Sequence, residues 1–175
     1  MRRRAALGFA AAALLVAGGA RAAFPARYAP TQVQPTGAPQ RYEFDLTAAL
    51  ARAAREKKRL YLYLGAVDCP FCRKYEAFLE RSADELVAPF AKDYIVYDLR
   101  SSLSVRQEKL FFRIGDKVLS YTDYMRSLGD ERERQLVYPS VWLLDAKGKP
   151  LMQMPAGTGT FETVPEQLEI LRLEQ

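Results

Sequence analysis

The sequence contains no histidine, and only two of its 175 residues are cysteine. Without an imidazole the chain cannot build a Ser-His-Asp triad, a Cys-His nucleophile pair, a His-ligated metal site or a C-x-x-C-H haem site. Any catalysis would therefore use thiols, carboxylates or amines. The length allows one ordinary domain, and hydrophobic residues, which make up 49% of the chain, are numerous enough to form its core.

The first 22 residues have the pattern of a secretory signal peptide. Three arginines at positions 2–4 precede an apolar run over residues 5–20, and residues 20–22 read Ala-Arg-Ala. We expect cleavage after Ala22 and an exported, periplasmic protein. An uncleaved membrane anchor is the alternative, although the run is shorter than the roughly 20 apolar residues that span a bilayer. The consecutive arginines suit the twin-arginine route as well as the general secretory one.

The basic net charge of the chain comes from this segment. The first 22 residues hold four of the 26 basic residues and none of the 21 acidic ones, which leaves a net charge of about +1 for the rest. Such a balance gives no support to a nucleic-acid-binding surface. We expect no nucleic acid among the partners.

The rest of the chain divides into a leader and one domain. Residues 23–40 contain four prolines and no sustained hydrophobic period, so we predict an extended Pro-rich leader there. The domain is expected over residues 41–175. An insertion over about residues 101–137 mixes aromatic and charged residues, and we expect two short helices in it.

The hydrophobic pattern of the domain predicts alternating helices and strands. An amphipathic helix is expected over residues 45–58, a strand buried on both faces at 60–64, and helices after Cys72 and after a Ser82 capping box. Strands are expected at 94–99 and 141–144, the latter joined by a turn at Gly148 to a partner at 151–154, and a last helix follows Thr163. This order predicts an α/β sandwich with a mixed central sheet flanked by helices.

The two cysteines form a Cys-Pro-Phe-Cys sequence at the start of the second expected helix. Unpaired backbone N–H groups and the helix dipole favour negative charge there, and such sites lower a thiol pKa from about 8.5 to roughly 3.5–7.5. We therefore predict Cys69 as the exposed attacking thiolate and Cys72 as the shielded resolving thiol. Phe71, between them on the first turn, is expected to be partly exposed and to contact substrate.

Other roles for the thiol pair have less support. A disulfide across three positions closes too short a loop to stabilise the fold much. A structural zinc site takes four ligands, whereas the chain offers two thiols and no imidazole. Two thiolates would suit Cu(I), so a copper carrier stays open as a minor alternative.

Three features together resemble the thioredoxin superfamily. They are the C-x-x-C at Cys69 and Cys72, the Tyr138-Pro139-Ser140 sequence before a strand, and the hairpin sequence at 144–150. The resemblance spans roughly residues 41–175 and is nearest to exported thioredoxin-like proteins. It implies a thioredoxin-like fold in which Pro139 is cis and faces the cysteine pair, while Tyr138 lends backbone groups to a bound substrate strand.

The sequence also departs from that family's pattern. Asp68 precedes the first cysteine, where many members have Trp, and Tyr63 stands where many have a buried acid that accepts the proton of the resolving thiol. No general base for Cys72 is therefore assigned. Lys74 and Asp98 are candidates by their proximity in the expected fold.

These features predict an exported thiol-disulfide oxidoreductase. Its partners would be proteins with thiols or disulfides and a membrane or periplasmic redox partner. No cofactor and no metal is expected. The alternative from another class is a non-enzymatic binding module in which the Cys69–Cys72 disulfide is structural.

Overall fold

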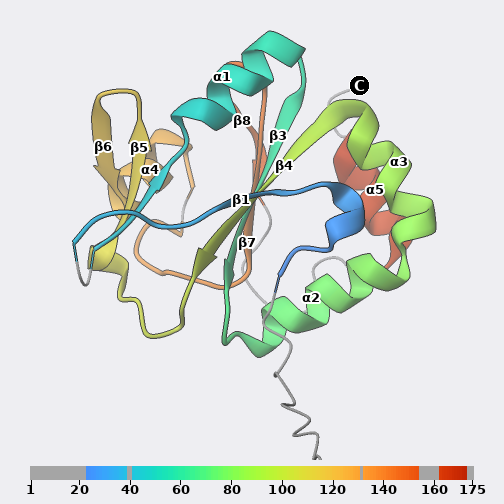
Figure 1. The fold of residues 1–175 in the computed structure, drawn as a ribbon, viewed down its shortest axis with the longest axis horizontal. Coiled ribbons are helices and arrows are strands. Elements are labelled where there is room, and N and C mark those ends of the chain that lie inside the picture. Colours follow the sequence, from blue (N-terminus) through green and yellow to red (C-terminus); the bar gives the residue numbers. More distant parts are fainter. Residues whose placement is uncertain (1–22, 39–40, 131, 154–161, 173–175) are drawn as a thin grey trace, which may run out of the picture.

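The computed structural model describes residues 23–38, 41–130, 132–153 and 162–172, which form a mixed α/β fold (Figure 1). In chain order the elements are η1 (Ala26–Tyr28), β1 (Thr31–Val33), β2 (Tyr42–Asp45), α1 (Thr47–Glu56), β3 (Arg59–Ala66), α2 (Pro70–Arg81), α3 (Ala83–Asp93), β4 (Tyr94–Ser101), η2 (Gln107–Lys109), β5 (Leu110–Ile114), β6 (Lys117–Ser120), α4 (Tyr121–Ser127), β7 (Ser140–Leu144), β8 (Pro150–Gln153) and α5 (Val164–Arg172).

A five-stranded mixed sheet lies at the centre, in the order β1-β4-β3-β7-β8. Strands β1, β4 and β3 are parallel, whereas β7 and β8 run antiparallel to their neighbours. The predicted mixed α/β architecture is therefore confirmed. The strand β3 is in the middle of the sheet and pairs with β4 on one side and β7 on the other. Its end leads to the cysteines.

The strand β3 is buried on both faces because its side chains alternate between two cores. Leu60, Leu62 and Leu64 pack with residues of α1, α4 and the small sheet β2-β5-β6. Tyr61 and Tyr63 pack on the opposite face with residues of α2, α3 and α5. Figure 1 shows these two layers on either side of the central sheet. The cysteines follow on the side that α2 covers.

The expected leader is part of the fold, so its prediction as an extended segment ahead of the domain is wrong for residues 23–38. Phe24 and Tyr28 are 3% and 7% exposed, and their rings pack edge-on against Phe90 of α3. The strand β1 pairs with β4 and forms one edge of the central sheet. A strand of three residues leaves no hydrophobic period in the sequence, so only tertiary packing identifies it.

The described part of the insertion contains the 3-10 helix η2, a β-hairpin and the helix α4, so of the two short helices predicted there α4 is present, whereas residues 110–112 form a strand. β5 and β6 pair antiparallel around a two-residue turn, Gly115-Asp116, in which Gly115 has φ +58°. A Gly-Asp pair between apolar runs is typical of such turns. β2 pairs parallel to β5 and completes the small sheet.

The longer predicted elements are confirmed as α1, β3, α2, β4, β7 and α5, and the turn before β8 has Gly148 at φ +81°. The helix α3 begins after Ser82, as predicted, but the Ser82 side chain makes no capping hydrogen bond. In α5 the Glu166 carboxylate accepts a bond from the Thr163 amide at 3.2 Å. None of the helices in the described ranges is both long and apolar enough to cross a membrane.

Candidate active site

The thiol pair lies where β3 gives way to α2. β3 ends at Ala66, whose carbonyl accepts a bond from the Cys69 amide at 3.1 Å and so closes a tight turn. Cys69 is the N-cap of α2 and Pro70 is its first residue, a position where the missing amide hydrogen of proline costs nothing. Both cysteines are free thiols, and Cys72 lies within the first helical turn.

The pKa of the Cys69 thiol is lowered to about 7, mainly because the Cys72 thiol donates a hydrogen bond to it. Burial opposes this effect, while the backbone amides of Cys72 and Phe71 add to it. The Cys72 amide lies 3.1 Å from the Cys69 Sγ. The negative charge of Glu76 acts in the opposite sense and keeps this pKa from falling further. Cys69 is therefore substantially a thiolate near neutral pH.

Cys72 has the opposite character. Its hydrogen bond to Cys69 and its complete burial raise its pKa, and the Tyr63 hydroxyl only partly counteracts them. Two thiols three positions apart thus differ strongly in acidity, mainly because the Cys72 thiol donates a hydrogen bond to the Cys69 sulfur, and also because the helix amides favour the Cys69 thiolate while burial disfavours a Cys72 thiolate. This pattern matches an attacking thiolate at Cys69 and a protonated second thiol at Cys72.

The expected exposure of Cys69 is wrong in this structure, because only 1% of the residue is accessible. Tyr138 packs against both cysteines, and its carbonyl oxygen lies 3.8 Å from the Cys69 Sγ. The thiol is nevertheless close to the surface, since the adjacent residues Asp68 and Pro70 are exposed.

Three exposed apolar side chains surround the turn that carries Cys69. Val67, Phe71 and Leu103 are 38%, 53% and 50% exposed, the large hydrophobic residues that the described part of the chain presents to solvent. The Asp68 carboxylate accepts a bond from the Leu103 amide at 2.8 Å, which holds Leu103 beside the turn. We call Val67, Phe71 and Leu103 the apolar rim. The predicted partial exposure of Phe71 is confirmed.

The Tyr138–Pro139 peptide bond is cis, as the resemblance implies, and it lies beside the thiols. Pro139 is buried directly before β7, and the Tyr138 hydroxyl donates to the Ser101 hydroxyl at 2.8 Å. Residues far apart in the sequence, Tyr138 and Cys69, thus meet at one end of the central sheet. The structure brings all five sequence-predicted site residues together there: Cys69, Phe71, Cys72, Tyr138 and Pro139.

Neither sequence candidate for a general base is available. The Lys74 side chain is 63% exposed and forms an ion pair with Glu162. Asp98 is fully buried, and its carboxylate accepts two bonds from the Arg100 guanidinium at 2.7 and 2.8 Å. The carboxylate linked to the thiols is Glu76, which sequence reasoning missed and whose Oε1 accepts a bond from the Tyr63 hydroxyl at 2.8 Å.

Glu76 belongs to a buried polar network next to the thiols. Its carboxylate also accepts a bond from Arg100 at 2.9 Å, and both side chains are at most 7% exposed. The guanidinium carbon of Arg100 lies 5.2 Å from the centre of the Tyr63 ring. Gly65 leaves the required room, because a Cβ there would come within 2.7 Å of both the Arg100 guanidinium and the Tyr63 ring.

The sequence does contain a signal for this network. Cys72, Tyr75, Glu76 and Leu79 follow the i, i+3, i+4, i+7 spacing of one helix face, so Glu76 is an acid within a buried stripe. Acids are rarely buried on such a face unless they have a partner. Arg100, two positions after Asp98 on β4, points to the same face and supplies that partner.

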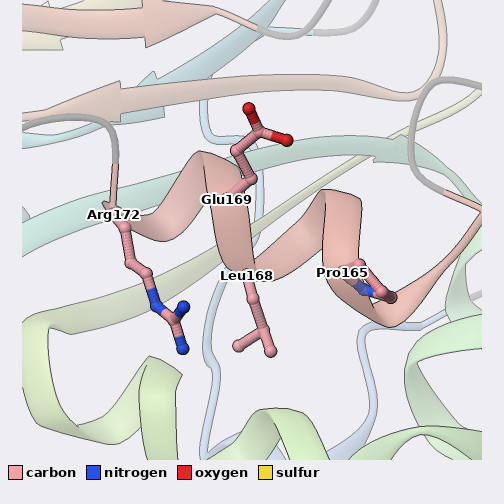
Figure 2. A pocket seen from close by; sticks show the side chains of 4 residues that line it. All are labelled: Pro165, Leu168, Glu169 and Arg172. Carbon is pink, nitrogen blue, oxygen red and sulfur yellow. The ribbon is translucent and has the colours of Figure 1, made fainter.

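A separate hollow on α5 has a different character. It is lined by Pro165, Leu168, Glu169 and Arg172 (Figure 2). All four residues come from one helix, and the hollow contains neither thiol nor any buried titratable group. We therefore assign the chemistry to the cysteine site.

The sheet order, the helix layers and the paired thiols at a helix start define a thioredoxin-like fold. The chain belongs to the thioredoxin-like domain family, whose model matches residues 46–170. No curated protein matches the chain.

Several solved structures are similar to this chain at low sequence identity. A thioredoxin-fold protein from Helicobacter pylori is 19% identical with a TM-score of 0.44, over 66% of this chain and 68% of that one. A disulphide isomerase from Xylella fastidiosa is 21% identical with a TM-score of 0.43, over 62% and 69%. A putative thiol:disulfide interchange protein DsbE from Chlorobium tepidum is 19% identical with a TM-score of 0.40, over 70% and 84%.

Proposed function

We propose that the protein is an exported thiol-disulfide oxidoreductase that acts on proteins. The observation that carries the proposal is the contrast between the two thiols: the pKa of Cys69 is lowered to about 7, while that of Cys72 is raised. A stable attacking thiolate next to a protonated second thiol is what disulfide exchange requires. The pattern of the first 22 residues supports export.

In the reductive direction the Cys69 thiolate attacks one sulfur of a substrate disulfide. A Cys69–substrate disulfide forms, and the other substrate sulfur leaves as a thiolate. Cys72 then loses its proton and attacks the Cys69 sulfur, which releases the second substrate thiolate and leaves a Cys69–Cys72 disulfide. Two electrons pass from the pair to the substrate, and the reverse sequence oxidises a substrate dithiol.

The second step needs a group that accepts the proton of Cys72. Tyr63 interacts with Cys72, and its hydroxyl donates to Glu76. Glu76 lies one helical turn beyond Cys72, so the hydroxyl joins thiol and carboxylate. We assign Glu76 as the proton acceptor and Tyr63 as the relay, which fills the role that sequence reasoning left open.

The substrate would bind across the apolar rim. An extended polypeptide can cover Val67, Phe71 and Leu103 with its own apolar side chains and so place its disulfide over Cys69. Tyr138 and Pro139, which lie beside the thiols, would contact the same substrate segment. A membrane or periplasmic redox partner would restore the pair after each turnover.

Two cysteine variants test the proposal. Cys69→Ser should abolish dithiol-dependent turnover of a protein disulfide, because no attacking thiolate is left. Cys72→Ser should accumulate a mixed disulfide through Cys69, visible by mass spectrometry and reversed by dithiothreitol. Full turnover by the Cys69→Ser variant would refute the proposal.

A redox titration separates this function from that of a binding module with a structural disulfide. The Cys69–Cys72 pair should equilibrate with glutathione in a thiol-labelling assay. A pair that resists reduction down to below about −300 mV would behave as structural. That outcome would favour the non-enzymatic module.

A further inference from the structure

The backbone nitrogens of Ala23 and Phe24 lie next to two buried carboxyl groups. The Ala23 backbone nitrogen lies 2.8 Å from Glu76 Oε2, and the Phe24 amide lies 3.2 Å from Asp98 Oδ2. Phe24 and the following Pro25 are buried, so the position of the Ala23 nitrogen is fixed by packing. Ala23 itself is exposed.

The charges around this nitrogen do not balance. Glu76 from α2 lies at the Ala23 nitrogen, Asp98 from β4 lies at the amide of the next residue, Phe24, and Arg100 from β4 pairs with both carboxyl groups. Tyr63 from β3 stays neutral because burial raises its pKa well above its usual range. Two carboxyl groups thus share one guanidinium in a buried site, where burial raises the pKa of Asp98, and the Asp98 Oδ1 accepts no hydrogen bond from the described residues. Buried charges are costly without a counter-charge.

We propose that cleavage after Ala22 supplies the missing cation, and that Glu76 and Asp98 form a binding site for the resulting α-ammonium group of Ala23. The proposal rests on the proposed export, but not on the redox activity. Hydrolysis of the Ala22–Ala23 peptide bond by a signal peptidase consumes one water molecule. It leaves a carboxylate on Ala22 and an amine on Ala23, which takes up a proton.

An ammonium group fits this position better than an amide. The amide offers one N–H, whereas the ammonium offers three and carries a full positive charge. One N–H keeps the bond to Glu76, the others are available to water at the exposed Ala23, and the positive charge lies one residue from the Phe24 amide that Asp98 binds. Charge-assisted hydrogen bonds of this type are roughly twice as strong as neutral ones.

Processing would also affect the cysteine site. The charge of Glu76 raises the pKa of Cys69, so an ammonium group on Glu76 should weaken that effect. The processed protein should then hold more Cys69 thiolate at neutral pH than the unprocessed one. Removal of the first 22 residues would thus increase thiol reactivity only after export.

The test begins with the N-terminus of the exported protein, which intact-mass spectrometry should place at Ala23. Residues 23–175 with a free Ala23 amine are then compared with the same chain preceded by Gly-Ser. In the free form the α-amino pKa, measured by NMR, should lie about 1–3 above its ordinary range of about 7.7–8.0. The extended form should melt at a lower temperature, and its Cys69 alkylation should have a higher pH midpoint.

Glu76→Gln and Glu80→Gln provide the matched controls. Both remove one carboxylate from α2, but Glu80 is exposed. Glu76→Gln should abolish most of the difference between the free and extended forms, whereas Glu80→Gln should preserve it. If the extended form does not fold, the α-amino pKa of the free form still tests whether Ala23 binds the carboxyl groups.

The proposal is overturned if the exported protein begins elsewhere than at Ala23. It is also overturned by an ordinary α-amino pKa, or by a difference between the two forms that Glu76→Gln leaves intact. None of these measurements depends on disulfide turnover. Failure of the cysteine variants described above would therefore leave this proposal standing, and failure here would leave the redox function standing.

Discussion

The charge of Glu76 affects the acidity of the Cys69 thiol. Because its carboxylate raises the pKa of Cys69, Glu76→Gln should lower that pKa below its present value of about 7. The pH dependence of Cys69 alkylation by iodoacetamide should shift to lower pH accordingly. The same variant should slow the release of a Cys69 mixed disulfide by Cys72, because the proposed proton acceptor is lost.

Glu80→Gln is the control, since Glu80 lies one turn further along α2 and is exposed. Its alkylation profile should match that of the unmodified protein. An unchanged profile in Glu76→Gln would contradict the assigned effect of Glu76 on Cys69. A lowered pKa without slower release would restrict Glu76 to an electrostatic effect.

Individual residues were predictable from the sequence where the local chain determines their role. Cys69 and Cys72 needed only their spacing at a helix start, and Phe71 only its place between them. The burial of Cys69 depends on Tyr138, 69 positions away, and that contact leaves no local pattern. Glu76 did leave one, as an acid in a buried helix stripe, but its partner Arg100 becomes evident only when α2 packs on β4.

At the scale of elements, the segment from Ala23 to Val33 is a structural part of the domain. Phe24 is 3% exposed and its ring meets Tyr61 and Tyr63 at centroid distances of 5.9 and 5.2 Å. Phe24→Ala should therefore lower the free energy of unfolding by about 3–5 kcal/mol, as measured by urea denaturation.

The matched substitution is Phe71→Ala, because Phe71 is 53% exposed. It should change the free energy of unfolding by no more than about 0.5 kcal/mol. It should instead raise the KM for a protein disulfide, because the apolar rim loses its largest side chain. A loss in Phe24→Ala as small as that expected for Phe71→Ala would contradict the assignment of Phe24 to the core.

The same segment shows which elements a sequence reveals. Helices α1 and α2 and strands β3 and β4 each span eight or more residues, so their hydrophobic periods are clear. The strand β1 has three residues and β2 has four, and their pairing partners β4 and β5 lie far along the chain. Short strands of this kind are defined by their neighbours, so the sequence does not reveal β1 in the leader, or the insertion's β5 and β6, which have only five and four residues.

At the scale of the whole molecule, one buried cation joins three parts of the fold. Arg100 on β4 binds Glu76 on α2 and Asp98 on its own strand, and these carboxylates hold the amides of Ala23 and Phe24. Apolar packing holds the two layers of helices against the central sheet. The polar network, in contrast, sets the position of Ala23, Phe24 and α2 relative to the central sheet. A change at Arg100 should therefore affect the entire fold.

Arg100→Met should lower the free energy of unfolding by about 3–5 kcal/mol, because it keeps the apolar volume but leaves two buried carboxylates without their cation. Arg106→Met is the control: the Arg106 side chain is 79% exposed and forms an ion pair with Glu108, so the change should stay within about 0.5 kcal/mol. Urea denaturation of both variants at neutral pH measures the difference.

Because the uncompensated carboxylates can be protonated, the Arg100→Met variant should regain part of its lost stability at lower pH. A loss below about 1 kcal/mol, with no recovery on acidification, would mean that the network does not hold these elements together.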